Sequence, residues 1–429
     1  MKIKLISLLC SAALLCTACS APQTAVSATD AQSNAASAAT KQTAKPLTVL
    51  RDDYSMTAEN EGGFYTVESP QSNQYQNIMY YDYNTMAQRY LCDVPNCTHD
   101  HKGCTSFLST TGGTFPMAFG DKLYVLYHYY DDGTSDKNLW KPAIEQRNAD
   151  GTGAQVLIQG DEKLRGGVAV TDGDAWYWTV GSEGKTVLIR FSLTDKTLTE
   201  VGVLPNNTIT LAESWNGKQL ALQYGTGNDP ANGTKLYAIS MQDASMELLH
   251  TWDGNTFCFL TAQLYDGKFL YTDRTNGDIR AYDLASDTDA VFTNIFAKKA
   301  VQMADATMTT GWGGGQILDD WMIVQGNMRN SEIITCLAGN LKTGEVKEIT
   351  LGDFWNGYVH PITIWKNTSH GALVTEEHRP RTVNTTGTGG EPYTFESDFW
   401  VYAFLSVDDL VHSVPNYREI TPVPYTGAH

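Results

Sequence analysis

The feature that most constrains the fold is a repeat of strand-rich units that runs through most of the chain. Each unit contains a short polar turn, usually Gly with Asp or Lys, followed at once by a β-branched and aromatic run. The turns lie at Gly62-Gly63, Gly120-Asp121, Gly173-Asp174, Gly217-Lys218, Gly267-Lys268, Asp319-Asp320 and His370-Gly371. They are roughly 44 to 57 residues apart. A small sheet of this length cannot cover both of its own faces, so it must stack on its neighbours.

The runs that follow these turns predict an all-β chain. Trp176-Tyr177-Trp178-Thr179-Val180 is one example of a run rich in residues that favour strands. Few stretches between residues 50 and 425 keep a helical spacing over three turns. The period therefore predicts a β-propeller over residues 47–429, with seven blades preferred and six blades as the runner-up. A pair of β-sandwiches is the alternative, but no clear linker separates two domains between residues 60 and 420.

The first 18 residues have the features of a signal peptide. Lys2 and Lys4 precede an apolar run from Leu5 to Leu15, which is too short to span a bilayer as a permanent helix. The sequence Leu15-Cys16-Thr17-Ala18-Cys19 resembles a bacterial lipobox, although Cys16 stands where Leu is commonest. The resemblance implies that Cys19 is lipidated and becomes the new N-terminus. An ordinary signal peptide cleaved near Ala18 is the alternative.

Residues 19–46 are predicted to form a flexible tether after the lipidated Cys19. Residues 20–46 are mostly Ser, Ala, Thr, Gln, Asn and Pro and include no aromatic residue. Such a segment cannot bury enough apolar surface to offset the entropy of ordering. Together with the lipobox, this predicts a protein anchored by lipid to the extracellular face of the cell membrane.

The charge balance limits the partners of the folded part. The 30 basic residues face 48 acidic ones, which gives a net charge of −18. A nucleic-acid surface requires a basic patch that releases counterions, so nucleic acid is excluded as a partner. The predicted partners are the membrane, through the N-terminal lipid, and an unidentified protein, peptide or glycan.

The most specific group of residues for chemistry is a cluster of cysteine and histidine between the first two units. Cys92, Cys97, His99 and Cys104 fall within 13 residues and match the thiolate and imidazole donors that Zn²⁺ accepts in tetrahedral geometry. Four protein ligands leave no open position, so this zinc would be structural. His101 is the alternative fourth ligand.

Two other readings of the three cysteines remain open. An exported protein can form disulfides, and Cys97 with Cys104, or Cys92 with Cys104, could close a small loop. Either pairing leaves one cysteine over. The other possibility is that all three thiols are unligated.

The segment from Ile144 to Leu157, which contains Asp150-Gly151-Thr152-Gly153, resembles the strand–turn–strand signature of TolB-like and YWTD-type propellers. The mature chain also resembles uncharacterised propeller lipoproteins of Gram-positive bacteria. These resemblances imply a fold and a location. They imply no activity, because propellers include enzymes, binding proteins and scaffolds.

The sequence contains no local catalytic motif: a Gly-x-Ser-x-Gly elbow, a phosphate loop and a His-Glu-x-x-His motif are all absent. Trp312, Trp355 and Tyr358 are candidates for an aromatic rim that stacks on a sugar or peptide; the alternative is packing between blades. The preferred function is therefore binding of a ligand or partner protein at the cell surface, without catalysis. The alternatives are a glycan-active hydrolase or lyase with its site in the propeller funnel, and an envelope assembly factor.

Overall fold

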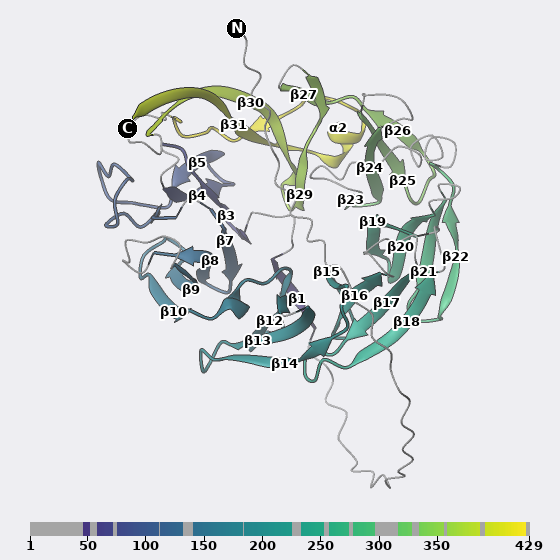
Figure 1. Ribbon diagram of the computed structural model, residues 1–429. Coiled ribbons are helices and arrows are strands. Elements are labelled where there is room, and N and C mark those ends of the chain that lie inside the picture. Colours follow the sequence, from purple (N-terminus) through teal and green to yellow (C-terminus); the bar gives the residue numbers. More distant parts are fainter. Residues whose placement is uncertain are drawn as a thin grey trace. The chain divides into compact units, whose positions relative to one another are not determined.

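Seven small antiparallel sheets follow one another along the chain and stand around a central axis, which confirms the predicted seven-bladed β-propeller (Figure 1). The computed structural model describes residues 46–51, 58–71, 75–110, 112–131, 140–182, 184–224, 233–252, 257–273, 278–296, 316–327, 334–355, 358–386 and 391–425. All of them belong to one compact unit, Ala44–His429. The predicted signal peptide, Cys19 and nearly all of the predicted tether lie outside the described residues.

Each blade is built from consecutive strands, and the first strand of each blade lies nearest the axis. Blade 1 contains β2 (Ala58–Asn60), β3 (Gly63–Glu68), β4 (Gln76–Asp82) and β5 (Ala87–Tyr90), with β6 (Phe107–Leu108) also paired to β4. Blade 2 contains β7 (Thr114–Phe119), β8 (Lys122–Tyr130), β9 (Lys141–Asn148) and β10 (Gln155–Gln159). A 3-10 helix, η2 (Glu162–Leu164), leads into blade 3, which contains β11 (Ala169–Thr171), β12 (Ala175–Ser182), β13 (Lys185–Ser192) and β14 (Leu198–Leu204).

The remaining blades repeat this order. Blade 4 contains β15 (Thr208–Trp215), β16 (Lys218–Tyr224), β17 (Thr234–Ile239) and β18 (Met246–Trp252). Blade 5 contains β19 (Phe257–Tyr265), β20 (Lys268–Asp273), β21 (Ile279–Asp283) and β22 (Thr288–Thr293). Blade 6 contains β23 (Gln316–Leu318), β24 (Trp321–Asn327), β25 (Ile334–Asn340) and β26 (Val346–Ile349). Blade 7 contains β29 (Ile364–Thr368), β30 (Gly371–Thr386), β31 (Pro392–Leu405) and β32 (Arg418–Glu419).

Three elements lie outside this pattern. A two-stranded ribbon of β27 (Gly352–Trp355) and β28 (Tyr358–Pro361) connects blade 6 to blade 7, and the short helix α2 (Val407–Val411) follows β31. Strand β1 (Thr48–Arg51) is the third. No helix in the described part of the chain is long and apolar enough to cross a membrane.

All seven turns singled out in the sequence join the first and second strands of a blade. The backbone explains the residue types at these places. Gly120, Gly173 and Gly267 adopt φ angles of 61°, 92° and 74°, and Asp319 adopts 52°. This left-handed region is readily available to Gly and tolerated by Asp, so the repeat of polar turns reflects a repeated backbone conformation.

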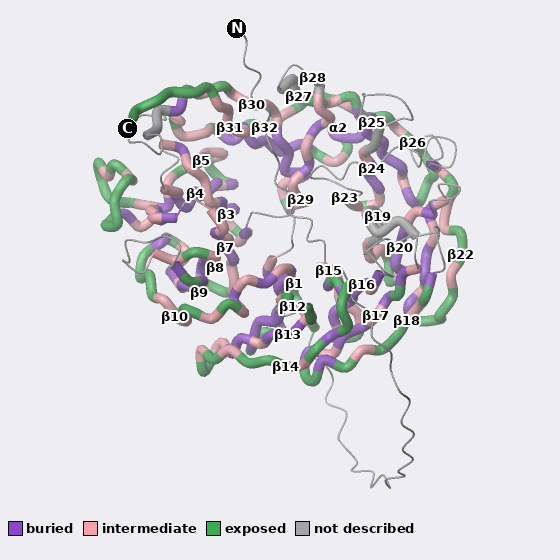
Figure 2. Tube along the Cα trace, viewed as in Figure 1, coloured by how far each residue is buried: buried purple, intermediate pink, exposed green. Residues whose placement is uncertain are grey.

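The hydrophobic core is divided into seven clusters, and each joins residues of two neighbouring blades. Between blades 2 and 3, for example, Trp176 is fully buried and meets the ring of Tyr124 at 4.5 Å between centroids. Figure 2 shows the buried residues along the blade strands, and exposed residues at the outer strands and turns. One of the seven clusters joins blade 7 to blade 1, so the ring is closed by packing of the same kind as elsewhere.

Strand β1 does not belong to the first blade, although residues from about 47 were expected to begin it. It pairs antiparallel with β11, the innermost strand of blade 3, with Thr48 opposite Thr171. The Arg51 guanidinium donates a hydrogen bond to the Gly166 carbonyl at 3.1 Å and lies 3.8 Å from the Phe115 ring centroid. The chain therefore runs along the axis first and begins blade 1 only at Ala58.

A C-terminal segment, residues 418–425, connects blade 7 to blade 1. Arg418 and Glu419 pair with β31, and the Ile420 amide donates to the Tyr402 carbonyl at 2.9 Å. The next residue, Thr421, exchanges 2.9 Å hydrogen bonds with Met86 and Gln88 at the start of β5. One segment thus extends the outer edges of both blades at the closing interface.

Candidate metal centre

The cysteine and histidine cluster lies on a loop of blade 1, residues 91–106, at the outer rim of the ring (Figure 1). Both ends of this loop are held by the same strand: Tyr90 pairs with Met79 of β4, and Phe107 pairs with Asn77 of β4. The loop is therefore a closed excursion from one strand. Its residues Asn96 and His99 adopt left-handed φ angles of 59° and 61°, which bend the chain back on itself.

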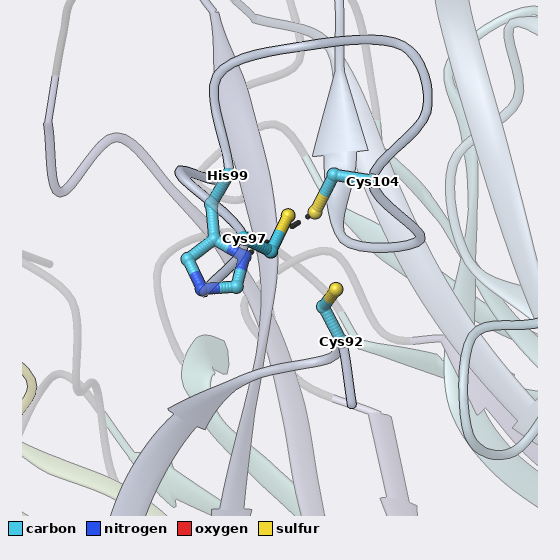
Figure 3. A group of neighbouring side chains, drawn as sticks. All are labelled: Cys92, Cys97, His99 and Cys104. Carbon is cyan, nitrogen blue, oxygen red and sulfur yellow. Dashed lines mark hydrogen bonds between the residues drawn. The ribbon is translucent and has the colours of Figure 1, made fainter. Parts of the chain in front are cut away.

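Four side chains of the loop converge (Figure 3). Ligand atoms of Cys92, Cys97, His99 and Cys104 all lie within 4.8 Å of one another. His99 Nδ1 lies 3.3 Å from Cys104 Sγ. Two sulfurs bound to one tetrahedral zinc would be about 3.8 Å apart. A modest shortening of the distances between the four ligand atoms would therefore form a tetrahedral coordination site. The predicted Cys₃His set is thus brought together by the fold.

Neighbouring side chains fix the orientation of these groups. The ring of Tyr90 stacks on the His99 imidazole with 4.0 Å between centroids and 10° between planes. The buried Asn77 amide donates to the His99 carbonyl at 2.9 Å and to Ser106 Oγ at 3.1 Å. Ser106 Oγ in turn lies 3.1 Å from Cys104 Sγ. Supporting contacts of this kind orient metal ligands, and no motif in the sequence pointed to Asn77 or Tyr90.

The surroundings of the thiols shift the pKa values of Cys104 and Cys92 in opposite directions. Burial raises the pKa of Cys104 to about 11, so without a cation its sulfur is a protonated thiol at neutral pH. Burial also acts to raise the pKa of Cys92, but hydrogen bonds from the Val94 backbone and Cys104 outweigh it and lower this pKa. Burial, followed by the neighbouring His101, lowers the pKa of His99, which favours the neutral imidazole that a metal requires.

The donor set that the fold brings together could hold a structural Zn²⁺. His101 lies on the exposed side of the loop, where its Nε2 is 3.8 Å from Cys97 Sγ and its Nδ1 accepts from the Gly103 amide at 3.1 Å. His99, not His101, therefore completes the group. Cys92, Cys97 and Cys104 form no disulfide in the structure. Zn²⁺ would here neutralise thiolates and hold the loop closed, with no open position for a substrate.

The described residues do not test the aromatic rim predicted from Trp312, Trp355 and Tyr358. Trp312 lies outside the described residues. Trp355 and Tyr358 are register partners at one end of the β27–β28 ribbon. The aromatic rim stays a prediction.

A cavity that no sequence motif indicated lies among the innermost strands. Its volume is about 500 Å³, and it is lined by Val49 and Leu50 of β1 and by residues of β2, β7, β29 and their turns. An adjoining cavity of about 420 Å³ shares Glu59, Asn60 and Glu61 with it. We call the two together the axial cavity. Because the innermost strands surround the axis, the axial cavity lies in the central funnel.

Hydrogen bonds and one ion pair organise the polar lining of the axial cavity. Lys366 Nζ lies 2.5 Å from Glu59 Oε2, and the Tyr83 hydroxyl donates to Glu59 Oε1 at 2.7 Å. Asn60 Nδ2 donates to the Tyr65 hydroxyl at 2.7 Å. Glu61 is exposed and lines both parts of the cavity. None of the described residues that line the axial cavity is a histidine or an arginine.

Comparison with known proteins gives similarity of shape only. No protein-family model matches the chain, and no curated protein matches its sequence. TolB from Acinetobacter baumannii is 11% identical over 84% of this chain and 77% of its own, with a TM-score of 0.34. The β-propeller domain of the Trilobed protease from Pyrococcus furiosus is 11% identical over 83% and 98%, with a TM-score of 0.40. An oligogalacturonate lyase in complex with manganese is 10% identical over 63% and 72%, with a TM-score of 0.35. The fold assignment rests on the seven sheets of this chain.

Proposed function

We propose that this chain is a lipid-anchored, non-catalytic β-propeller that binds a ligand at the cell surface, stabilised by a structural zinc in the loop of blade 1. The observation that carries the binding role is the axial cavity, one part of which has a volume of about 500 Å³, in the range of small-molecule sites. Its described lining combines neutral polar side chains with apolar ones and with the Glu59–Lys366 ion pair; the neutral polar residues are Asn60, Asn367, Thr368 and Ser369.

The charged groups of the axial cavity support binding over catalysis. A glycosidase requires a pair of carboxylates, one of them able to donate a proton. Glu59 is already engaged by Lys366 and Tyr83, and within the described part of the lining no His or Arg accompanies Glu61. Groups that are fixed in mutual hydrogen bonds can recognise a polar ligand without transferring protons.

A ligand screen tests this role. The unit Ala44–His429 is applied to a glycan and peptide array, and binding of the best ligand is then measured by calorimetry. The double substitution Glu61→Ala/Ser369→Ala is expected to weaken binding by about tenfold or more, because it removes exposed polar groups at the mouth of the axial cavity. Glu391→Ala, an exposed glutamate on the β30–β31 connection, is the matched control. Turnover of a glycan would contradict the non-catalytic role.

The lipid anchor is tested by a separate substitution. Cys19→Ser is expected to shift the protein from the membrane fraction to the soluble fraction, since the acyl chains supply the membrane affinity. Cys16→Ser, three residues earlier, is the matched control and should stay membrane-bound. Equal membrane association of the two variants would show that Cys19 carries no anchor. Fractionation with acyl-chain labelling gives both readouts.

A further inference from the structure

A second cavity, distinct from the axial cavity, lies on the outer wall of the ring. It separates blade 2 from the loop at residues 91–106 that carries the candidate metal ligands, which we call the zinc loop. Its volume is about 350 Å³. The loop contributes residues from Lys102 to Thr105, β6 and the two residues after it contribute Phe107 to Thr110, and blade 2 contributes residues of β8, β9 and the turn before β10. We call this the loop cavity. Cys104, one of the four candidate metal ligands, is part of its lining.

The floor of the loop cavity is a buried ion pair. Arg147 Nε lies 2.5 Å from Glu145 Oε1, and the two side chains are only 6% and 8% exposed. The Tyr127 hydroxyl donates to the same Glu145 oxygen at 3.2 Å. Glu145 and Arg147 both line the loop cavity. A carboxylate that is already held in place by an ion pair and a tyrosine hydroxyl is a preorganised acceptor for a ligand hydroxyl or amide.

Arg147 also joins this floor to the zinc loop. Its Nη1 donates to the carbonyl of Thr105, the residue that follows Cys104. Thr105 in turn donates from its hydroxyl to the Leu91 carbonyl at 2.7 Å, next to Cys92. The wall of the loop cavity is therefore connected at both ends to metal ligands. A bound metal would fix this wall against blade 2.

The described charged side chains of the loop cavity form two ion pairs. Besides the Glu145–Arg147 pair, Lys102 Nζ lies 2.8 Å from Asp131 Oδ2, and the Asp131 side chain is 13% exposed. Among the described lining residues, each cation thus faces an anion, and neither pair favours an ionic ligand.

The rest of the lining combines aromatic rings with hydroxyl groups. Tyr127 and Tyr130 meet edge to face at 5.1 Å between centroids, and Phe107 lies on the loop side. Ser109 and Thr110 contribute hydroxyls. Rings that offer an apolar surface, with fixed donors and acceptors beside them, suit a molecule with both C–H faces and hydroxyl groups.

We infer that the loop cavity is a second binding site, for an uncharged carbohydrate, and that the metal-loaded loop forms one of its walls. A sugar hydroxyl can donate to the Glu145 carboxylate and accept from a neighbouring donor, while a sugar ring packs on Tyr130 or Phe107. The neutral lining selects a neutral sugar over its charged counterpart, because a charge placed beside two closed ion pairs would be desolvated without a partner.

The test uses the zinc-loaded unit Ala44–His429 and a panel of methyl glycosides: glucoside, galactoside and N-acetylglucosaminide, with glucuronide and glucosaminide as charged counterparts. Saturation-transfer NMR identifies binders, and calorimetry gives their Kd. At least one neutral glycoside is expected to bind, and its charged counterpart to bind at least tenfold more weakly. Failure of every neutral glycoside, or equal binding of the charged ones, would overturn the assignment.

Two variants locate the site. Ala154→Trp places a large ring into the loop cavity from an exposed position and is expected to abolish binding. Gln155→Trp is the matched control, because Gln155 is exposed and is not among the described residues that line the loop cavity, and it should retain binding. Binding that survives Ala154→Trp would overturn the location. Glu61→Ala should leave this binding unchanged, which separates the loop cavity from the axial cavity of the proposed function.

The role of the metal has its own readout. Chelation of zinc, verified by metal analysis and by an unchanged far-UV spectrum, is expected to raise the Kd for the neutral glycoside by about tenfold or more. Restored zinc should restore the original Kd. An unchanged Kd after zinc removal would show that the loop wall does not depend on the metal.

Discussion

Replacing Cys104 by serine is expected to reduce the zinc content of the purified protein from about one ion per chain to nearly none. Cys104 is the most buried of the four donors and lies 3.3 Å from His99 Nδ1. A serine hydroxyl is a poor zinc ligand, and a site with three remaining donors loses both affinity and closure. Plasma mass spectrometry on protein purified without chelators gives the content directly.

Cys336 provides the matched control for this experiment. It is buried in blade 6, and burial raises its pKa to about 12, so it behaves as a small apolar residue far from the zinc loop. Cys336→Ala is expected to leave one zinc per chain. A well-folded parent protein that contains no zinc would contradict the metal site outright, and zinc retained by Cys104→Ser would assign the ion to other ligands.

The second large effect is expected at the closing interface between blades 7 and 1. Tyr425 stacks on Phe399 with 4.1 Å between centroids, and its hydroxyl donates to Glu68 and accepts from Gln88 Nε2 at 3.0 Å. Burial, followed by the Glu68 charge, raises the pKa of Tyr425 well above its ordinary value, so the phenol remains a donor. Tyr425→Ala should lower the free energy of unfolding by about 3 kcal/mol.

Removing the residues that follow Glu419 should cost more. Ile420 is 1% exposed within the core cluster of blades 7 and 1, and truncation after Glu419 deletes it together with Tyr425. We expect a loss of about 5 kcal/mol or more, which approaches the total stability of many domains. Urea denaturation measures both variants. Tyr393→Ala, at a tyrosine of β31 that is 49% exposed, should change stability by no more than about 0.5 kcal/mol. An equally small effect of Tyr425→Ala would show that the segment does not hold the ring.

The architecture was predictable because its signal is local and repeated. Each turn such as Gly120-Asp121 occupies the same place in its blade, and each is recognisable within a few residues. The candidate metal ligands were predictable for the same reason, since Cys92 and Cys104 are close in sequence as well as in space.

Contacts between distant segments could not be predicted in this way. The pairing of Thr48 with Thr171 and the hydrogen bond from Gln88 to Tyr425 join residues with no shared pattern. Arg147 looked like an ordinary strand residue, and only the packing of blade 2 against the zinc loop gives it a partner at Thr105. Both cavities depend on such contacts.

The position of β1 has a consequence for the order in which the molecule is assembled. An N-terminal segment that will lie along the axis finds its partner strand, β11, only after about 120 further residues have been made. Blade 1 is completed later still, because its Gln88 bonds to Tyr425, which lies 337 positions further along the chain. During folding the leading strand therefore stays unpaired and the first sheet stays open until the last blade has formed, so avoidance of aggregation depends on the speed of this final step.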